Sequence, residues 1–187
     1  MSELCFTPIF GEYFEALPYQ SLGHIFSKNE HPILDVFGPT VQFLTTPAEA
    51  GEDLCVMRGV IQPGGVVPMH AHSGVECFYM LSGQLEVLVE EEGKFRWVLA
   101  STGDFVHVPS EAKHGFRNTS SEPAVSLIST TARLGHFFEE IGRPVVPGAQ
   151  PAPPSPEEMQ RFMETAGRYH YWMGTPDENA AVGISLF

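Results

Sequence analysis

Short apolar runs separated by turn residues fill the middle of the chain. From Val41 to about Ala132 these runs recur roughly every 8 to 12 residues, a spacing typical of antiparallel sandwiches and barrels. The runs are VQFL (41–44), LCVMRGVI (54–61), VECFYML (75–81), QLEVLVE (84–90), FRWVLA (95–100), DFVHV (104–108) and AVSLIST (124–130). The pattern therefore predicts an all-β domain.

The two ends of the chain lack this pattern. Residues 1–39 are interrupted repeatedly by Pro and Gly, which predicts an N-terminal arm with at most short regular structure. We expect the barrel to occupy 40–135 and a C-terminal extension to occupy 136–187.

A helix is predicted inside the C-terminal extension. The stretch from Pro144 to Pro156 is too rich in proline to form a central strand or a helix. Ser155 is a good N-cap, Pro156 suits the first helical position, and Glu158 completes a capping box. A helix of about 156–167 would carry one apolar face for packing, formed by Met159, Phe162, Met163 and Ala166.

Charge and cysteine usage narrow the class of protein. The 187 residues include 10 Lys and Arg against 23 Asp and Glu, so the net charge is −13. Nucleic acids and anionic membrane surfaces need a basic face, so neither is expected as a partner. No signal peptide, no transmembrane run and no CxxC pair is evident, which indicates a cytoplasmic protein with reduced thiols, one disulfide being the alternative.

Histidines and one carboxylate concentrate in residues 64–83, GGVVPMHAHSGVECFYMLSG. His70 and His72 share one face of a strand because their spacing is two residues. A bend at Ser73-Gly74 would return the chain and bring Glu76 to the same point. Imidazole and carboxylate together suit a divalent transition metal, and His114 from a separate segment could add a third imidazole.

Two segments resemble the conserved motifs of the cupin superfamily, G-x5-H-x-H-x3-E-x6-G and G-x5-P-x-G-x2-H-x3-N. The first motif matches at every fixed position, and the second matches at Gly103, Pro109, His114 and Asn118. Glu111 stands where the family usually has the Gly of a tight turn, so we expect that turn to be rebuilt. The resemblance covers about residues 40–132. The short spacing between the two motifs is similar to that of small bacterial monocupins.

The resemblance implies a jelly-roll barrel, the double-stranded β-helix of cupins, with one metal ion held by His70, His72, Glu76 and His114. The ion would be Fe, Ni, Mn, Cu or Zn, and four protein ligands on a six-coordinate ion would leave two positions open. Glu76 would also act as a catalytic base if displaced from the ion, as in quercetinase-like cupins.

Further residues are candidates for the pocket. His107 is a candidate catalytic or proton-relay group if it faces the cavity. Arg58 is a lone charge in an apolar strand, so it would bind an anionic substrate or pair with a core carboxylate. Substrate-lining residues expected from period two are Phe78, Met80, Phe116 and Asn118, with ordinary core packing as the alternative.

These features support two hypotheses. The first is a metal-dependent dioxygenase-like oxidoreductase acting on a small chelating substrate with dioxygen; within the superfamily the same ligands serve isomerases, lyases and decarboxylases of acids or sugars. The second is a non-catalytic barrel that binds a small ligand. The aromatic arms also predict a homodimer, because a lone small barrel cannot easily bury them.

Overall fold

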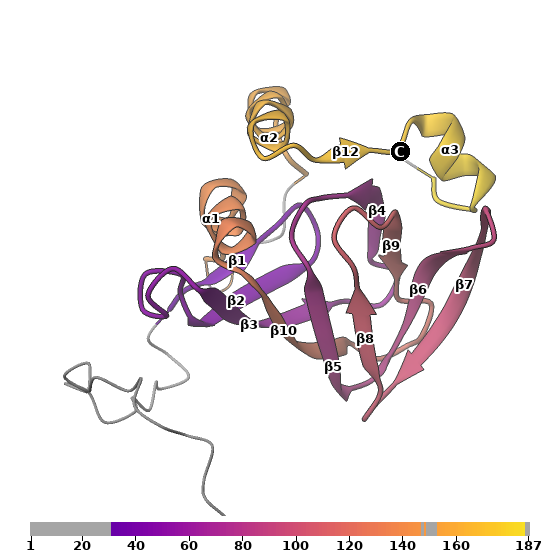
Figure 1. Ribbon diagram of the computed structural model, residues 1–187, viewed down its shortest axis with the longest axis horizontal. Helices are drawn as coiled ribbons and strands as arrows, with labels where there is room; N and C mark the ends of the chain where they lie inside the picture. The colour runs from indigo at the N-terminus through magenta and orange to yellow at the C-terminus, as the bar shows by residue number, and fades with distance from the viewer. Residues whose placement is uncertain (1–30, 147, 149–152, 186–187) are drawn as a thin grey trace, which may run out of the picture.

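Two antiparallel sheets face each other in the computed structural model, which describes residues 31–146, 148 and 153–185 (Figure 1). The larger sheet has the order β11-β1-β2-β3-β10-β5-β8. Its strands are β1 (Ile33–Asp35), β2 (Thr40–Thr45), β3 (Leu54–Ile61), β5 (Glu76–Ser82), β8 (Phe105–Val108), β10 (Ala124–Thr131) and β11 (Arg143–Pro144). The smaller sheet has the order β12-β4-β9-β6-β7. Its strands are β4 (Val66–Ala71), β6 (Gln84–Glu91), β7 (Lys94–Ser101), β9 (His114–Arg117) and β12 (Trp172–Met173).

Alternation along the strands builds the core between the sheets. In β10, every second side chain is buried from Ala124 to Thr130, as expected for a strand with one covered face. The central core residues are Met57, Phe78, Met80, Val87, Phe116 and Ile128. The predicted all-β jelly-roll barrel is therefore confirmed.

Helices cover one end of the barrel. α1 (Ala132–Ile141) directly follows β10 and was not predicted; the Thr131 side chain accepts the N–H of Leu134 as its N-cap. α2 (Pro156–Arg168) begins with the predicted capping box of Ser155 and Glu158. The two helices lie next to each other in Figure 1 and share an aromatic cluster that includes Phe137 and Phe162. None of the described helices is long and apolar enough to cross a membrane.

The C-terminal extension is joined to the smaller sheet. β12 pairs with β4, with Trp172 opposite Ala71 and Met173 opposite His70. α3 (Pro176–Ala181) then carries Asn179, whose side chain accepts the Met69 N–H at 2.9 Å. The extension therefore lies against the strand that carries the predicted metal ligands.

The N-terminal arm is described only in part. Its last residues form β1, which pairs with β2 and with β11 at the edge of the larger sheet. Residues 1–30 lie outside the described part of the chain, and with them His24 and Cys5. Cys55 and Cys77 are free thiols, and they face opposite sides of the larger sheet because they oppose the adjacent β10 residues Thr130 and Ser129.

Candidate metal centre

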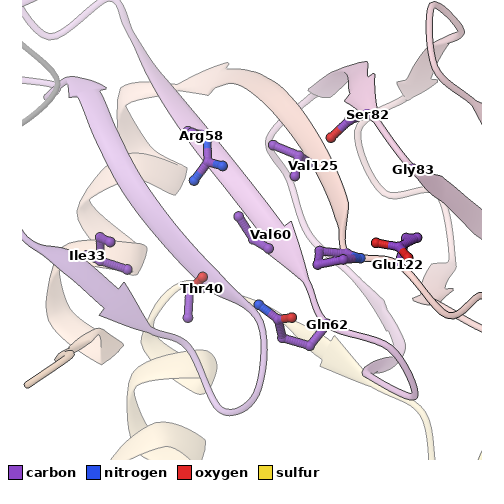
Figure 2. A pocket seen from close by; sticks show the side chains of 10 residues that line it. Ile33, Thr40, Arg58, Val60, Gln62, Ser82, Gly83, Glu122 and Val125 are labelled. Carbon is purple, nitrogen blue, oxygen red and sulfur yellow. The ribbon is translucent and has the colours of Figure 1, made fainter. Parts of the chain in front are cut away.

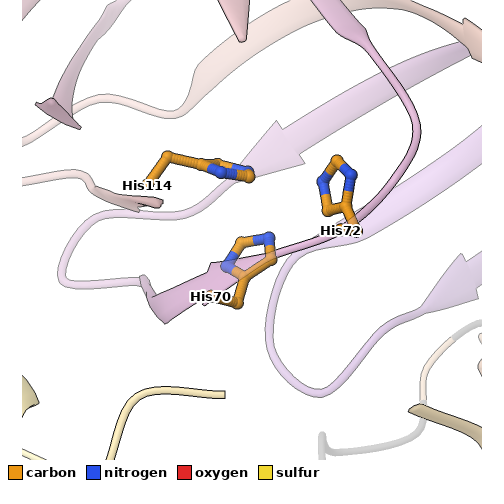
Figure 3. Close-up of side chains that lie close together, drawn as sticks. All are labelled: His70, His72 and His114. Atoms are coloured by element: carbon orange, nitrogen blue, oxygen red, sulfur yellow. The ribbon is translucent and has the colours of Figure 1, made fainter. Parts of the chain in front are cut away.

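Three buried imidazoles meet between the sheets (Figure 3). His70 is the last residue but one of β4, His72 directly follows that strand, and His114 begins β9; one ring nitrogen of each lies within 4.8 Å of the others. His70 and His114 are direct partners across the β4–β9 pair, so their ring centroids are only 4.1 Å apart. The predicted convergence of the two motifs is thus present in the structure.

Each imidazole is oriented by a backbone carbonyl two residues away. The Nδ1 atoms of His70, His72 and His114 each lie 2.8 Å from a carbonyl oxygen, those of Pro68, Gly74 and Ala112 respectively. A carbonyl oxygen only accepts, so Nδ1 carries the proton and Nε2 of the neutral ring carries a lone pair. A hydrogen bond from the ring nitrogen that does not bind the metal is the usual way in which a protein fixes a metal-binding histidine.

Glu76 brings a carboxylate to the same place. It begins β5 and is buried, and its Oε2 lies 3.3 Å from His72 Nε2 and 3.6 Å from His114 Nε2. Burial alone would raise the pKa of this carboxyl, but its contacts with His114 and His72 outweigh burial and hold the pKa well below the usual range. The side chain is therefore an ionised, electron-pair-donating group.

The cluster as it stands has an excess of electron-pair donors. Nε2 of His72 and Nε2 of His114 are buried and have no hydrogen-bond partner. Both face the Glu76 carboxylate, an arrangement that is favourable only when a positive charge lies between them, either a proton on a ring or a bound cation. The donor set of imidazole nitrogens and one carboxylate oxygen fits a divalent transition metal ion.

His70 is held in the neutral form that metal binding needs. Burial, and then the neighbouring His114, lower the pKa of His70 to about 3. Its ring therefore keeps a lone pair on Nε2 across the physiological pH range. The same burial excludes water that would otherwise solvate the donors.

An aromatic residue from the C-terminal extension lies beside this centre. The ring centroid of Tyr171 is 6.0 Å from that of His70, nearly parallel to it, and 5.0 Å from that of His72. Burial and the charge of Glu76 raise the pKa of Tyr171 well above 10. The sequence indicates only that the arms are aromatic and does not single out Tyr171, because the pairing of β12 with β4 has no local signal.

The turn before His114 holds a non-glycine residue in a left-handed conformation. Glu111 has φ 64°, which is the left-handed region that glycine would favour, and its N–H donates to the His72 carbonyl at 2.8 Å. The glutamate itself adopts this strained conformation, and the turn contacts the His72 segment directly. That the turn is rebuilt relative to the family stays a prediction.

Three of the predicted pocket residues form the core beneath the centre. Phe116 contacts the His114 ring edge-on at a centroid distance of 5.5 Å and packs on Phe78 at 4.9 Å. Met80 is completely buried in the same core. These side chains support the ligands from below, and they line neither the groove beside Arg58 nor the cleft beside His114.

Asn118 has a structural role in place of the predicted pocket role. Its Nδ2 donates to the carbonyls of Ile61 and Glu122, and its Oδ1 accepts from Ser120. All of its polar capacity is directed to closing a loop, because a buried amide without partners would be costly. No hydrogen-bonding group of its side chain remains for a substrate.

His107 does not face the metal centre. Its β5 partner is Cys77, whereas the neighbouring Val106 and Val108 oppose Phe78 and Glu76 on the inner face. His107 is therefore exposed on the outer face of β8, away from the three imidazoles, but it lies in the lining of a cleft of about 590 Å³ that also includes His114. Its role as a catalytic or proton-relay group stays a prediction. The alternation in DFVHV fitted either face, and only the strand register decides between them.

Arg58 also lies outside the barrel. It is exposed on β3 between the buried Met57 and Gly59, and it lines an open groove of about 600 Å³ on the outer face of the larger sheet (Figure 2). Its predicted roles, binding a substrate in the barrel or pairing with a core carboxylate, are therefore not supported by its position. Its neighbours in the groove include Thr40, Val60 and Gln62.

A second cleft lies beside His114 of the metal centre. It has a volume of about 590 Å³ and lies between β6 and β8, where the two sheets are not hydrogen-bonded to each other. His114 is part of its wall. The apolar part of the wall is formed by Val87, Leu88, Val89, Val106, Val108, Pro109 and Ala112.

Comparison with known proteins agrees with this geometry. Residues 57–130 match the family model of the cupin domain. Quercetin 2,3-dioxygenase of Bacillus subtilis (strain 168) is 29% identical over 106 residues, which are 55% of this chain and 30% of that protein. The chain thus spans about a third of this relative's length.

Solved structures of oxalate decarboxylase from Bacillus subtilis share the fold. The structure at pH 4.6 has a TM-score of 0.51 and 23% identity, over 59% of this chain and 30% of that one. A tryptophan-to-phenylalanine variant has a TM-score of 0.53 and 23% identity, over 67% and 33%. At this level of identity the likeness concerns the fold and not the reaction.

Proposed function

We propose that this protein, whose residues 57–130 form a cupin domain, is a mononuclear metal-dependent enzyme of the dioxygenase type. The observation that supports the proposal most is the set of buried, unpartnered Nε2 atoms facing an ionised carboxylate. His70, His72, Glu76 and His114 would hold the ion. Such an ion supplies Lewis acidity and open positions at which a substrate and dioxygen can bind.

The protein residues have distinct proposed roles around that ion. The three carbonyl-anchored imidazoles fix its position, and Glu76 is both a donor to it and the nearest carboxylate base for a substrate proton. The buried Phe78 and Phe116 exclude water from the inner side of the site. Substrate would enter through the cleft between β6 and β8, next to His114.

The cleft favours an apolar, planar substrate over a small dianion. Its lining is apolar in large part, with four valines among its residues, and it also includes Glu90, Glu92 and Glu111. A divalent ion with one carboxylate ligand carries a local charge of about +1, which suits a singly ionised enol or phenol. The three carboxylates outnumber the one ammonium group in the lining, that of Lys113, so the cleft would repel a compact dianion such as oxalate.

Other activities of the superfamily remain as alternatives. An isomerase, lyase or decarboxylase of a small acid or sugar would use the same ligand set, and a non-catalytic barrel would use it only for binding. The likeness to a dioxygenase in sequence, together with the apolar cleft, favours the oxidative reaction.

Metal content is the first test of this proposal. The full chain purified after growth with Fe, Mn, Ni, Cu or Zn is expected to hold about one ion per chain, measured by inductively coupled plasma mass spectrometry. The double variant His70→Ala, His72→Ala should hold almost none. His136→Ala is the matched control, because that imidazole is bound by Glu52 and Glu139 away from the centre.

Oxygen uptake separates the enzyme from a binding protein. The metal-loaded chain is incubated with catechols, flavonols and 1,3-diketones in an oxygen-electrode cell. Stoichiometric uptake with one class, absent in the double variant, is the expected result. A chain that holds its metal but consumes no oxygen with any of the three classes would contradict the dioxygenase proposal, and a metal-free wild type would contradict the site itself.

A homodimer and a reducing location complete the proposal. Tyr79 and Phe105 are neighbours on the outer face of the larger sheet, and they are 45% and 64% exposed. Apolar side chains exposed side by side on one sheet favour association with a second copy. The free thiols of Cys55 and Cys77 support a reducing compartment such as the cytoplasm.

A further inference from the structure

Tyr171 occupies a position beside the proposed metal centre that the cupin motifs do not account for. It lies in the C-terminal extension, beyond residues 57–130, at the point where the chain leaves α2 and enters β12. Among the histidines of the centre it approaches His70 and His72, the two ligands contributed by the β4 segment.

The ring of Tyr171 is held firmly on both sides. Its other neighbour is Phe137 of α1, which stacks on it at a centroid distance of 4.1 Å and an angle of 24°. The Tyr171 N–H donates to the Ala166 carbonyl at 2.9 Å, and the next two residues pair with β4. A side chain fixed in this way loses little further entropy when it contacts a ligand.

The hydroxyl of Tyr171 has no protein partner within the described ranges 31–146, 148 and 153–185. Tyr169, two residues earlier, differs in this respect, because its hydroxyl donates to Glu140 at 2.6 Å. A tyrosine placed in a largely apolar setting usually gives its hydroxyl a partner. The Tyr171 hydroxyl is not among the buried polar atoms that lack a partner, so it is accessible, and its ring lies beside two ligands of the centre. It is therefore a donor that a ligand bound at the centre can reach.

We propose that Tyr171 contacts the substrate, and that its hydroxyl donates a hydrogen bond to an oxygen of a ligand bound at the open positions of the ion. This inference rests on the proposed metal site. It makes the C-terminal extension a part of the site, and it assigns to Tyr171 the orientation of a chelating enol or phenol. No bond to the ring is made or broken.

The test uses the full chain loaded with Co²⁺, with 4-nitrocatechol as the chelating probe and azide as the small one. Binding is followed through the visible spectra of the ion and of nitrocatechol. Tyr171→Phe removes only the hydroxyl, so metal content and melting temperature should match the wild type. The dissociation constant for 4-nitrocatechol should rise about two- to tenfold, the range of one net hydrogen bond.

Tyr169→Phe is the matched control and should leave both dissociation constants unchanged. Equal binding of 4-nitrocatechol by Tyr171→Phe and the wild type would overturn the proposal, as would a wild type that holds Co²⁺ but binds neither probe. Loss of metal in Tyr171→Phe would show a structural role and would also overturn it. A wild type that holds no metal would instead refute the proposed function from which this inference starts.

Discussion

Glu111 shows how a single residue can hold a costly backbone conformation at the edge of a functional site. Its φ of 64° lies where a side chain costs about 1–2 kcal/mol, and its N–H bond to the His72 carbonyl fixes the turn beside two proposed ligands. The residue type and the backbone conformation are therefore in conflict at this position. Substitution can measure the size of that conflict.

Glu111→Gly should stabilise the protein. Glycine relieves the left-handed strain and keeps the N–H bond, but it also gives the unfolded chain more freedom, so the free energy of unfolding should rise by only about 0.5–1 kcal/mol. Urea unfolding monitored by tryptophan fluorescence measures the change. Glu164→Gly in the middle of α2 is the control and should lower stability by about 1 kcal/mol. A destabilised Glu111→Gly would contradict this account of the turn.

His136 should make stability depend on pH. Hydrogen bonds to Glu52 and then to Glu139 raise the pKa of His136 above 6.5. The folded state thus binds this proton more tightly than the unfolded state, so the stabilisation is complete below pH 6.5 and is lost as pH rises through the raised pKa. The contribution is below about 1 kcal/mol because the side chain is 39% exposed.

Comparison of the wild type with His136→Gln measures this effect. The difference in their free energies of unfolding should be larger at pH 6 than at pH 9, since glutamine does not titrate. Urea unfolding at the two pH values gives both numbers. An equal difference at pH 6 and pH 9 would show that the charge of His136 has no part in stability.

Among the elements, β12 and α3 have a role that the sequence did not predict: they attach the C-terminal extension to the smaller sheet. They attach to β4 through backbone pairing and through Asn179, which is completely buried and bonds Met69, Gly174 and Thr175. An amide that satisfies three backbone groups at once fixes the position of the whole segment. Tyr171 therefore keeps its place because of a residue eight positions further along the chain.

Asn179→Ala should loosen this attachment. Several buried backbone groups would lose their partners, at a cost of roughly 2–3 kcal/mol. Amide hydrogen exchange should accelerate at Met69 and Gly174 and remain unchanged in β10. Asp177→Ala, an exposed change in the same helix, should leave exchange in the segment as it is. Unchanged exchange in Asn179→Ala would mean that strand pairing alone holds the extension.

Local sequence patterns predicted most of the helices and strands. The features that they did not predict depend mainly on contacts between residues distant in the sequence. The strand runs, the α2 capping box and the convergence of His70, His72, Glu76 and His114 follow from periodicity and short motifs. The face of His107 depends on strand register, which alternation in four residues cannot fix. The place of Tyr171 depends on the pairing of β12 with a strand about a hundred residues earlier. The cap at Thr131 was a usable signal for α1 that the sequence interpretation overlooked.

At the scale of the whole molecule, the smaller sheet carries most of the proposed metal ligands, and the larger sheet carries exposed apolar residues. Apart from Glu76, the proposed ligands lie in β4 and β9 of the smaller sheet or directly after β4, and the extension adds β12 to that same sheet. The larger sheet presents apolar residues outward, among them Tyr79, Leu81 and Phe105. β8 is the edge strand of the larger sheet and forms one wall of the cleft. If two copies associate through their larger sheets, the partner would therefore lie near the cleft without closing it.

Sedimentation should therefore report a particle of about twice the chain mass of 20.6 kDa. The double variant Tyr79→Glu, Phe105→Glu should sediment as a monomer, because two buried charges in an interface cost far more than they gain. Leu99→Glu introduces a charge at an exposed apolar residue of the smaller sheet and should remain dimeric. A wild type that sediments as a single chain would reject the homodimer.

The carbonyl anchors of the three histidines have a consequence for how the centre can change over evolutionary time. Every amino acid offers a main-chain carbonyl, so replacing Pro68, Gly74 or Ala112 would not remove the acceptor that aims each ring. The orientation of the three imidazole rings therefore does not change when these neighbouring side chains are substituted. Lineages sharing this scaffold are free to exchange the wall of the cleft, and with it the chemistry, while the metal-binding geometry persists.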